Sequence, residues 1–424
     1  MITGNLSRLS FMKTRFNTIF KWLYPGIGVK RWIGLGAFGV ILLITGTAYL
    51  RNEEFWPLQL LDAVTIFSGI IILILGIKRM MRSFMGAFAP SSRDNELVDL
   101  LFLKKQLSRG PRIVTIGGGT GLAVLLTGLK EYTSNITAIV TVADSGGSSG
   151  RLRQEFDILP PGDIRNCLVA LADAPALMRD LFQFRFETSS DLSGHSFGNL
   201  FITVMTRLTG DFEKAIKETS KVLALRGRVI PSTLDSVMLV ATHKDGTTTV
   251  GEDKIPAALK PIARVYLEPN NPQATPDAVS AIREAQIVVL GPGSLYTSII
   301  PNLLIKEIAE ALHACSAVKV YVSNMMTQPG ETDGFSALDH IKALVTHSHP
   351  RVIDYCILNS GIVPPEILKR YAEQNSGIVV NDRKKIENMG YRLIEDDFGI
   401  IEEGVMRHDS AKLARLILGL LEEV

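Results

Sequence analysis

The chain has 424 residues, 46% of them apolar, and a formal net charge of +2 at pH 7. This length is enough for one large domain, or for two smaller domains with sizeable cores. The near-neutral charge argues against nucleic acid as the main partner, because a phosphate backbone is usually met by a strongly basic face.

Two apolar runs precede residue 80, at 33–50 and 58–77. Each is long enough to cross the hydrocarbon core of a membrane as a helix, and Asp62 is the only charged residue in them. A signal peptide is the alternative interpretation of the first run, but a long tail precedes it and the second run follows at once. We therefore expect a transmembrane helical hairpin.

Basic residues lie on the outer side of both runs. They are Lys13, Arg15, Lys21, Lys30 and Arg31 before the first run, and Lys78, Arg79 and Arg82 after the second. By the positive-inside rule, both ends face the cytoplasm, which predicts a multi-pass protein of the cell membrane. The expected organisation is a cytoplasmic tail at 1–30, the hairpin at 31–79, a linker with a short amphipathic helix at 80–109, and an α/β domain at 110–424.

From residue 112 onward, short β-branched runs alternate with helical patterns. The runs are 113–116, 136–142, 237–241, 287–290, 318–322 and 352–358. This alternation predicts a parallel sheet with helices on both faces. A local hairpin is expected at 244–246, where Asp-Gly separates two strand-like runs, and a closing helix within 409–424.

The sequence RIVTIGGGTG at 112–121 joins a strand to a helix through several glycines. Unpaired backbone N–H groups at such a helix start can bind an anion such as a phosphate. The dinucleotide pattern G-x-G-x-x-G fails at Leu122, and no Walker lysine follows. A tight structural turn is the alternative.

A second glycine turn, DSGGSSGR, follows the strand at 136–142. Asp144 stands at the end of this strand and could orient a ribose, a metal or a hydroxyl group, or could simply cap the turn. The next motif, PPGDIRN, contains Asp163, which we expect as a helix N-cap or as a partner of Arg165.

Two further motifs supply polar groups. GHSFGN places His195 and Asn199 at a helix start, and GPGS at 291–294 follows the strand at 287–290. Ser294 or Thr297 could donate to phosphate oxygens, and Asn324 follows the strand at 318–322. All three glycine turns stand at the carboxyl ends of strands, so they can meet at one site.

Motifs for other chemistries are absent. There is no G-x-S-x-G elbow and no HExxH, and the cysteines Cys167, Cys315 and Cys356 lack a CxxC spacing. We expect His347 and His349 to lie in a solvated loop before Pro350. The residues suit the positioning of a phosphorylated ligand better than nucleophilic hydrolysis.

As a set, six motifs resemble the gluconeogenesis factor family (YvcK-like), which is related to 2-phospho-L-lactate transferase (CofD-like). They are RIVTIGGGTG, VADSGGSSGRLR, PPGDIRN, GHSFGN, LGPGSLYTSIIPNLL and NMMTQPGETDGFSALDH. The resemblance runs from about Arg109 to the C-terminus and leaves the hairpin outside. It implies a doubly wound Rossmann-like core that binds a UDP-sugar, such as UDP-N-acetylglucosamine, and a link to cell shape and to the supply of envelope precursors.

The resemblance of these motifs to the family indicates the expected ligand-binding residues. Gly118 to Gly121 and Gly291 to Ser294 would lie at the phosphates, Asp144 and Asn199 near the sugar or base, and Asn324 at the crevice. In full, the expected set is Gly118, Gly119, Thr120, Gly121, Asp144, Ser145, Gly146, Gly147, Ser148, Arg165, Asn166, His195, Asn199, Gly291, Pro292, Gly293, Ser294 and Asn324.

One position departs from the family pattern. The second turn usually reads ADDGGSSG, and Ser145 replaces its second acid. The loss of a carboxylate weakens the case for a Mg²⁺-dependent reaction, so we expect a membrane-anchored UDP-sugar-binding regulator. The sequence predicts no certain cofactor and no set of metal ligands. It leaves open whether the protein forms a homo-oligomer. The alternative is a Mg²⁺-dependent transferase that uses a nucleotide diphosphate carrier, with Asp144, Asp163 and His195 at the reacting centre.

Overall fold

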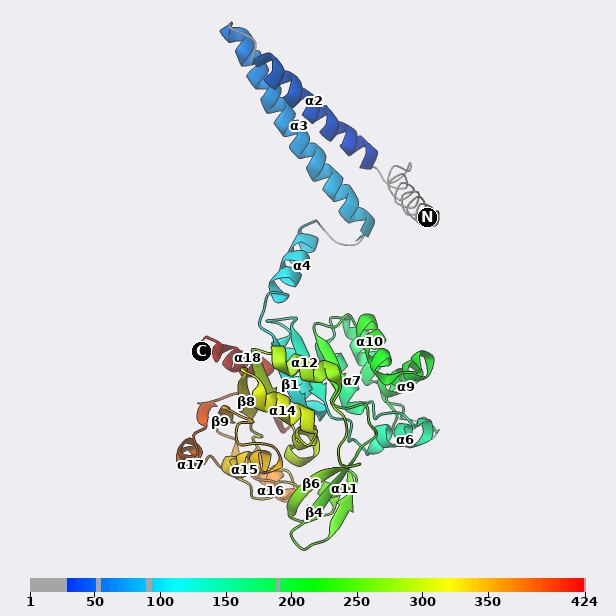
Figure 1. Ribbon diagram of the computed structural model, residues 1–424, viewed down its shortest axis with the longest axis vertical. Coiled ribbons are helices and arrows are strands. Elements are labelled where there is room, and N and C mark those ends of the chain that lie inside the picture. The colour runs from blue at the N-terminus through cyan, green and yellow to red at the C-terminus, as the bar shows by residue number, and fades with distance from the viewer. Residues whose placement is uncertain (1–28, 51–54, 89–93, 188–190, 423–424) are drawn as a thin grey trace, which may run out of the picture. The chain divides into compact units, whose positions relative to one another are not determined.

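The computed structural model describes residues 29–50, 55–88, 94–187 and 191–422, which divide into two compact units at 1–103 and 104–424 (Figure 1). The expected cytoplasmic tail falls almost wholly outside the described residues.

The first unit is built on two long helices, α2 (Val29–Leu50) and α3 (Trp56–Phe88). Most of their large apolar side chains are exposed, and by length and composition both helices could span a membrane. They pack closely through glycines, because a Cβ at Gly39 would lie 2.8 Å from the backbone nitrogen of Leu73 and 2.9 Å from the carbonyl oxygen of Gly69. Small residues allow this approach between apolar helices.

A helix, α4 (Asp94–Leu107), forms within the segment at 80–109 that was predicted to be a linker with a short helix. Its C-terminal end joins the α/β unit through backbone and side-chain hydrogen bonds, since the N–H of Ser134 donates to the Leu107 carbonyl at 3.0 Å and the Asn135 side chain donates to the Gly110 carbonyl at 2.7 Å.

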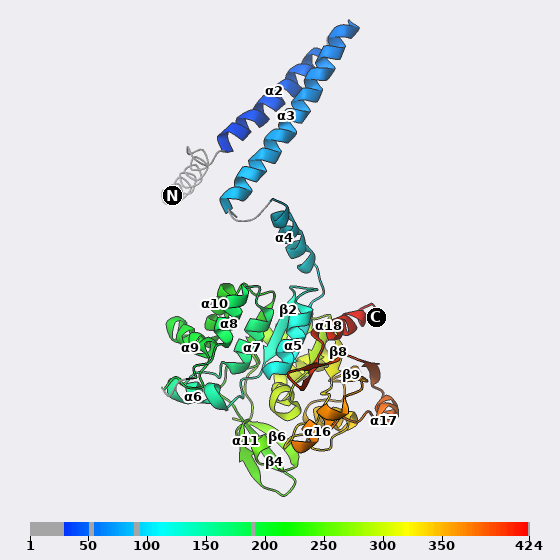
Figure 2. The same ribbon diagram turned by 180° about the vertical axis from the view of Figure 1, so that it is seen from behind.

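The α/β unit contains a seven-stranded parallel sheet in the order β10-β9-β8-β7-β1-β2-β3. From β1 the chain adds β2 and β3 on one side and then β7 to β10 on the other, so the strand order reverses between β1 and β7. This is a doubly wound topology, and ligands bind such sheets in the crevice at the reversal point. Figures 1 and 2 show α12 and α14 on one face, and α5 and α18 on the other.

Five strands of this sheet were predicted from the sequence, and the structure confirms them with small differences at their ends. They are β1 (Ile113–Gly117), β2 (Ile136–Val140), β7 (Ile287–Leu290), β8 (Val318–Val322) and β9 (Tyr355–Asn359). Two edge strands were missed, β3 (Arg228–Pro231) and β10 (Arg392–Asp396). Each of them has only two successive aliphatic residues, flanked by charged residues or proline, so its apolar run is too short to indicate a strand.

The run at 237–241 does not join the parallel sheet, contrary to the prediction. It forms β4 (Met238–His243), which pairs antiparallel with β5 (Thr248–Val250) and β6 (Ile262–Glu268) in a separate sheet. The predicted hairpin at 244–246 explains the difference, because a tight turn can join only antiparallel neighbours. We call residues 238–268 the insert.

Helices connect these strands. Those that follow the glycine motifs are α5 (Gly119–Leu129), α6 (Gly147–Phe156), α7 (Gly162–Leu171), α9 (Phe197–Thr209) and η1 (Leu295–Ile299), which continues into α13 (Ile300–Leu303). The others are α8 (Ala176–Gln183), α10 (Phe212–Val222), α11 (Lys254–Ala257), α12 (Pro276–Glu284), α14 (Lys306–Ala314), α15 (Ala337–His347), α16 (Pro365–Glu373) and α17 (Arg383–Asn388).

The predicted closing helix is α18 (Ser410–Gly419), with Asp409 as its N-cap, and it follows the hairpin of β11 (Gly399–Glu402) and β12 (Val405–His408). It packs against α5, where a Cβ at Gly128 would lie 2.0 Å from the Ser410 carbonyl oxygen.

His347 is not in a solvated loop, contrary to the prediction. It ends α15 and is only 8% exposed. Its Nδ1 lies 2.7 Å from the Ala343 carbonyl, and its Nε2 accepts the N–H of Val265 at 3.1 Å. The ring therefore joins α15 to the insert, a role that depends on a backbone 82 residues away.

Candidate functional site

The first and third glycine turns meet at the point where the strand order reverses. Gly118 to Gly121 follow β1, and Gly291 to Ser294 follow the neighbouring β7. Their backbones touch, since a Cβ at Gly121 would lie 2.6 Å from the Pro292 carbonyl oxygen. No side chain larger than hydrogen fits at Gly121 without moving this backbone, so the glycine keeps the two turns in contact.

A cleft of about 450 Å³ opens beside these two turns. One wall contains Gly118 to Gly121, Pro292 to Ser294 and Ser298, and another contains Asn324 to Pro329 at the end of β8. A third wall comes from the C-terminal part of the chain and was not predicted. Its residues are Tyr371, Gln374, Ser376, Met406 and His408.

A chain of side-chain hydrogen bonds crosses the cleft wall. The Asn324 amide donates to Oε1 of Gln328 at 3.3 Å, and Nε2 of Gln328 donates to the Ser294 hydroxyl at 2.7 Å. Ser294 therefore accepts here and keeps its own proton for a ligand, while Oδ1 of Asn324 keeps the capacity to accept. The two predicted polar residues thus lie on two adjoining walls of the cleft, which Gln328 joins.

The third wall is tied to the second by the Ser376 hydroxyl, which donates to the Thr327 carbonyl, and is held together by further contacts. The Tyr371 hydroxyl accepts the N–H of Met406 at 3.0 Å. His408 stacks on Phe398 with ring centroids 5.7 Å apart, and burial lowers its pKa to about 4. The imidazole is therefore neutral near pH 7.

Asp163, at the start of α7, connects the first and second glycine turns. Contrary to the prediction, Asp163 is not an N-cap, because α7 begins at Gly162 and Pro161 holds the cap position. Its carboxylate lies against Gly118 and accepts a hydrogen bond from the N–H of Gly119. Burial and the nearby Asp144 raise its pKa to about 7.

Asp144 caps its own turn, which was the alternative prediction for it. Its Oδ1 accepts the N–H of Gly146 at 2.9 Å, and its Oδ2 lies close to Gly162, at the start of α7. The starts of α6 and α7 therefore meet around Asp144.

A buried polar network links the second turn to the GHSFGN motif. The Ser148 hydroxyl accepts from the Asn199 amide at 3.0 Å and lies 2.9 Å from Nδ1 of His195. Because Ser148 accepts from Asn199, its proton is free to point to His195, which favours the tautomer with the proton on Nε2. Burial lowers the pKa of His195, and the nearby Arg151 adds to this effect.

Arg165 completes this network and does not pair with Asp163 in the described region. Its guanidinium donates to Ser196, to Oδ1 of Asn199 at 3.1 Å and to Oδ1 of the adjacent Asn166 at 2.7 Å. Burial lowers its pKa to about 10. The structure brings Ser148, Arg165, Asn166, His195 and Asn199 together, but these residues hydrogen-bond to one another and do not line the cleft.

Glu331 is a site residue that the sequence analysis missed. Its carboxylate accepts from the N–H of Tyr296 at 3.3 Å and from the Thr297 hydroxyl at 3.1 Å, at the start of η1. Thr297 therefore serves this carboxylate rather than a phosphate. Burial raises the pKa of Glu331 to about 7. The acidic residue within the TQPGETDG segment was the sequence signal that could have identified Glu331 as a site residue.

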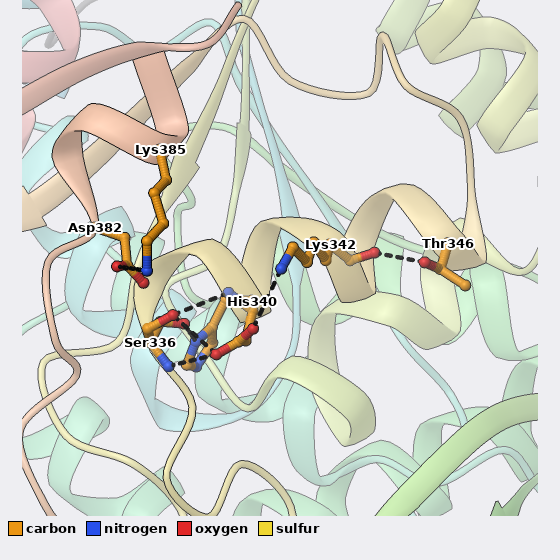
Figure 3. Close-up of polar contacts among 7 residues, drawn as sticks. Ser336, His340, Lys342, Thr346, Asp382 and Lys385 are labelled. Atoms are coloured by element: carbon orange, nitrogen blue, oxygen red, sulfur yellow. Dashed lines mark hydrogen bonds and ion pairs between the residues drawn. The ribbon is translucent and has the colours of Figure 1, made fainter. Parts of the chain in front are cut away.

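The rest of that motif has a structural role (Figure 3). Ser336 and Asp339 form a capping box at the start of α15, and Nδ1 of His340 lies 2.9 Å from the Ser336 carbonyl. Lys385 and Asp382 form an ion pair at 2.9 Å beside it. The motif therefore divides into a cleft segment at 324–331 and a helix start at 336–340.

The insert also reaches the site, through two acids that were not predicted. Ser145 donates to Oδ1 of Asp253 at 2.5 Å. Burial, together with the charges of Asp144, Asp163 and Glu331, raises the pKa of Glu252 to about 8. Among the residues that the structure describes, no group of three or more histidine, cysteine or acidic side chains has the geometry of a metal site.

Comparison with known proteins agrees with this architecture. The model of the 2-phospho-L-lactate transferase CofD family matches residues 113–399. The gluconeogenesis factor of Bacillus subtilis (strain 168) is 48% identical over 317 residues, which are 75% of this chain and 100% of the relative. A crystal structure of a Bacillus halodurans protein superposes with a TM-score of 0.72 at 47% identity, covering 73% of this chain and all of that one.

A longer relative also matches the N-terminal region. A gluconeogenesis factor homologue from Nostoc sp. (strain PCC 7120) is 46% identical over 429 residues, which are 95% of this chain and 93% of the relative. Because the match covers 95% of this chain, it includes at least part of the two apolar helices. The expectation that the hairpin lies outside the resemblance was therefore wrong for this relative, although the Bacillus subtilis protein matches over its whole length within 75% of this chain.

Proposed function

The chain belongs to the gluconeogenesis factor family, and we propose that it is a membrane-anchored, cytoplasm-facing protein that binds a UDP-sugar and regulates envelope precursor metabolism and cell shape. UDP-N-acetylglucosamine is the proposed ligand. In this proposal the cleft binds the nucleotide and the anchor keeps the protein beside the membrane where envelope precursors are consumed.

The observation that carries this proposal is the meeting of glycine turns at the reversal point of the sheet. The first N–H groups of α5 have no partner inside the helix, and Thr120 and Gly121 line the cleft. The dipole of α5 favours negative charge at this end. Because the N–H of Gly119 is bound to Asp163, a diphosphate placed here would accept from the N–H groups of Thr120 and Gly121 and from the Ser294 hydroxyl.

The second and third walls suit a nucleoside. Met325, Met326, Met406 and Tyr371 present apolar and aromatic surface, and Asn324 and Gln374 present amide groups beside it. A mostly apolar lining with a few polar groups is typical of small-molecule sites, and the volume falls within their usual range. We therefore place the base against the third wall and the phosphates against the first.

A binding experiment tests the proposal directly. The full chain in detergent is titrated with UDP-N-acetylglucosamine, GDP and NAD, each with and without Mg²⁺, by isothermal titration calorimetry. We expect the UDP-sugar to bind without Mg²⁺ and the other two nucleotides to bind much more weakly. Absence of UDP-sugar binding at millimolar concentration would refute the proposal.

Melting curves can give a second readout, since a ligand that binds only the folded state raises the melting temperature. The three tryptophans, Trp22, Trp32 and Trp56, all precede the α/β unit, so tryptophan fluorescence does not report on it. The three cysteines lie within the α/β unit, and Cys167 and Cys356 are buried. A thiol-reactive dye therefore reports the unfolding of the ligand-binding unit.

A transferase is the second candidate, because the matching family model is that of 2-phospho-L-lactate transferase. Acid side chains surround the second turn, but the described residues offer no ready-made metal site. An enzyme of this kind would take Mg²⁺ together with the phosphates of its nucleotide. Binding of GDP that requires Mg²⁺, in the titration above, would favour this candidate over the regulator.

The anchor is tested by fractionation. We expect the full chain to stay in the membrane pellet after alkaline carbonate extraction, and a tag at either end to be protected from protease in intact cells. If deletion of residues 1–90 leaves the localisation unchanged, the hairpin is not the anchor.

A further inference from the structure

A second cavity, of about 640 Å³, opens at the edge of the parallel sheet where β8, β9 and β10 begin. We call it the amino-edge cavity. Its walls come from 315–319, 350–355 and 389–392, and each of these stretches leads into one of the three strands. The nucleotide cleft lies at the opposite edge, where the strands end and where Ser294 and Asn324 line it. The two cavities share no lining residue and are therefore separate.

Lys319, at the start of β8, gives the amino-edge cavity a buried positive charge. The residue is only 7% exposed. Its Nζ donates to the Ala317 carbonyl at 3.3 Å and forms an ion pair with Asp354 at 3.2 Å. An ammonium group has three N–H donors, so one donor remains for a ligand.

Tyr355 and Arg392, at the starts of β9 and β10, supply further donors. Nη1 of Arg392 donates to the Tyr355 hydroxyl at 2.7 Å, and the guanidinium carbon lies 5.4 Å from the centroid of the Tyr355 ring. Because Tyr355 accepts in this contact, its own proton is available to a ligand, and the guanidinium keeps its other N–H groups. The contact also holds the two side chains in place across neighbouring strands.

Positive charge exceeds negative charge in the lining of this cavity. Lys319, Arg351 and Arg392 are basic, and Asp354 is the one acid among the described lining residues. The carbonyl ends of α14 and α17 stand beside the cavity and add about half a negative charge each. An excess of positive charge remains. Guanidinium groups match the geometry of phosphate oxygens, so the cavity suits a phosphate group.

Asp354 suits a different part of the same ligand. Its Oδ2 accepts the backbone N–H of Lys319 at 2.9 Å and also faces the ammonium, which leaves Oδ1 able to accept from a hydroxyl group. The cavity is larger than a phosphate needs and falls within the usual range of small-molecule sites. A phosphate at the basic side chains with hydroxyl groups toward Asp354 describes a sugar phosphate.

We propose that the amino-edge cavity is a second ligand site, which binds a sugar phosphate separately from the nucleotide cleft. The phosphate accepts from Lys319, Tyr355 and Arg392, and a sugar hydroxyl donates to Asp354. This inference goes beyond the proposed binding of a UDP-sugar and does not depend on it, because no residue of the cleft takes part.

Cys315 lines the cavity and provides a local readout. It is half-buried, whereas Cys167 and Cys356, the other two cysteines of the chain, are buried. The full chain in neutral detergent is labelled with dithiodipyridine, an uncharged thiol reagent, at constant ionic strength. Ribose 5-phosphate at about 10 mM should slow the labelling of Cys315 about threefold or more, as for a millimolar dissociation constant. Ribose should have no effect, and inorganic phosphate should protect only at higher concentration.

The charge of the cavity is tested with a second reagent, dithiobis(nitrobenzoate), which is negatively charged. Arg351→Gln and Arg392→Gln remove exposed basic groups from the lining. Each should lower the ratio of the labelling rates of the charged and uncharged reagents about threefold, as for the loss of one nearby unit charge in water. The ratio cancels changes in access to the thiol. Lys244→Gln is the matched control, because it removes an exposed charge from the insert and should leave the ratio unchanged.

The outcomes separate cleanly. Protection by ribose 5-phosphate that Arg392→Gln abolishes and Lys244→Gln retains supports the inference. Failure of ribose 5-phosphate to protect Cys315, or equal protection in Arg392→Gln, would overturn it. Equal protection by inorganic phosphate at the same concentration would overturn the assignment of a sugar phosphate. If Arg392→Gln does not fold, Arg351→Gln gives the same comparison. The titration of the cleft with UDP-N-acetylglucosamine is a separate measurement, so either proposal can fail alone.

Discussion

The carboxylate of Asp163 lies directly against the backbone of Gly118, so that a Cβ at position 118 would lie 2.5 Å from its Oδ2. Gly118 precedes α5, and Asp163 belongs to the first turn of α7. The first glycine turn and the PPGDIRN motif are therefore joined by a contact that only glycine allows.

Gly118→Ala should destabilise the α/β unit by about 1–3 kcal/mol, as for other overpacked sites. The backbone of Gly118 is extended, so the cost comes from the clash with Asp163 and with Thr141, 2.8 Å away. The melting temperature with the thiol-reactive dye measures it. Gly117→Ala is the matched control, because its nearest contacts would be ordinary ones at 3.7 Å; equal effects of both substitutions would contradict the steric explanation.

Asp163→Asn should remove a pH dependence of stability. The pKa of Asp163 is about 7 in the folded protein, against an ordinary value of 3.8. The folded state therefore binds a proton that the unfolded state has lost, so stability is greatest below pH 3.8 and falls until about pH 7. The loss amounts to a few kcal/mol.

Asparagine keeps an acceptor for the N–H of Gly119 but does not titrate. The difference in unfolding free energy between variant and unmodified protein should therefore grow in favour of the variant from pH 4 to pH 7 and then level off. Urea denaturation at several pH values measures it. A difference that stays constant across this range would show that the carboxyl group titrates normally.

Gly128→Ala should loosen the contact between α5 and α18, because the new Cβ would lie 2.0 Å from the Ser410 carbonyl oxygen. We expect a loss of about 1–3 kcal/mol or more. Gly419→Ala, in α18, has no neighbour within 4 Å and should instead stabilise the helix slightly, by about 0.5–1 kcal/mol. Denaturation measures the unfolding free energy of both variants. A Gly128→Ala variant that is more stable than the unmodified protein would refute the predicted clash.

Gly39→Leu should separate the two apolar helices, because its side chain would meet the backbone of α3 at Leu73. Arg79 of α3 lies over the Trp32 ring of α2, with 4.9 Å between the guanidinium carbon and the ring centroid. In a chain that retains Trp32 as its only tryptophan, separation should change the emission of this residue. Gly34→Leu, with no neighbour within 4 Å, should not, and a similar spectral change in both would count against glycine packing.

Much of the fold could be predicted because its signals are local. The five inner strands follow from β-branched runs between turn residues, and the hairpin at 244–246 follows from its turn sequence. The glycine turns were placed at strand ends for the same reason. Parallel strands align their carboxyl ends at one edge, so this local placement was enough to predict that Gly118 and Ser294 lie near one site.

Other features depended on contacts between distant segments. Only the tertiary structure put Glu331 at the start of η1, His347 against the insert, and Tyr371 and Met406 in the cleft wall. The residues at 237–241 were predicted to be a strand of the parallel sheet, because an apolar pattern does not indicate which strand a run pairs with.

By itself, the sequence determined the two long apolar helices, the doubly wound order of alternating elements and the glycine turns that close its strands. The tertiary structure alone decided which acids meet at those turns, because burial and mutual repulsion arise only when segments such as Asp144, Asp163 and Glu252 are packed together. Backbone preference is set by neighbouring residues along the chain, whereas the charge and shape of a site are set by residues that are neighbours only in space.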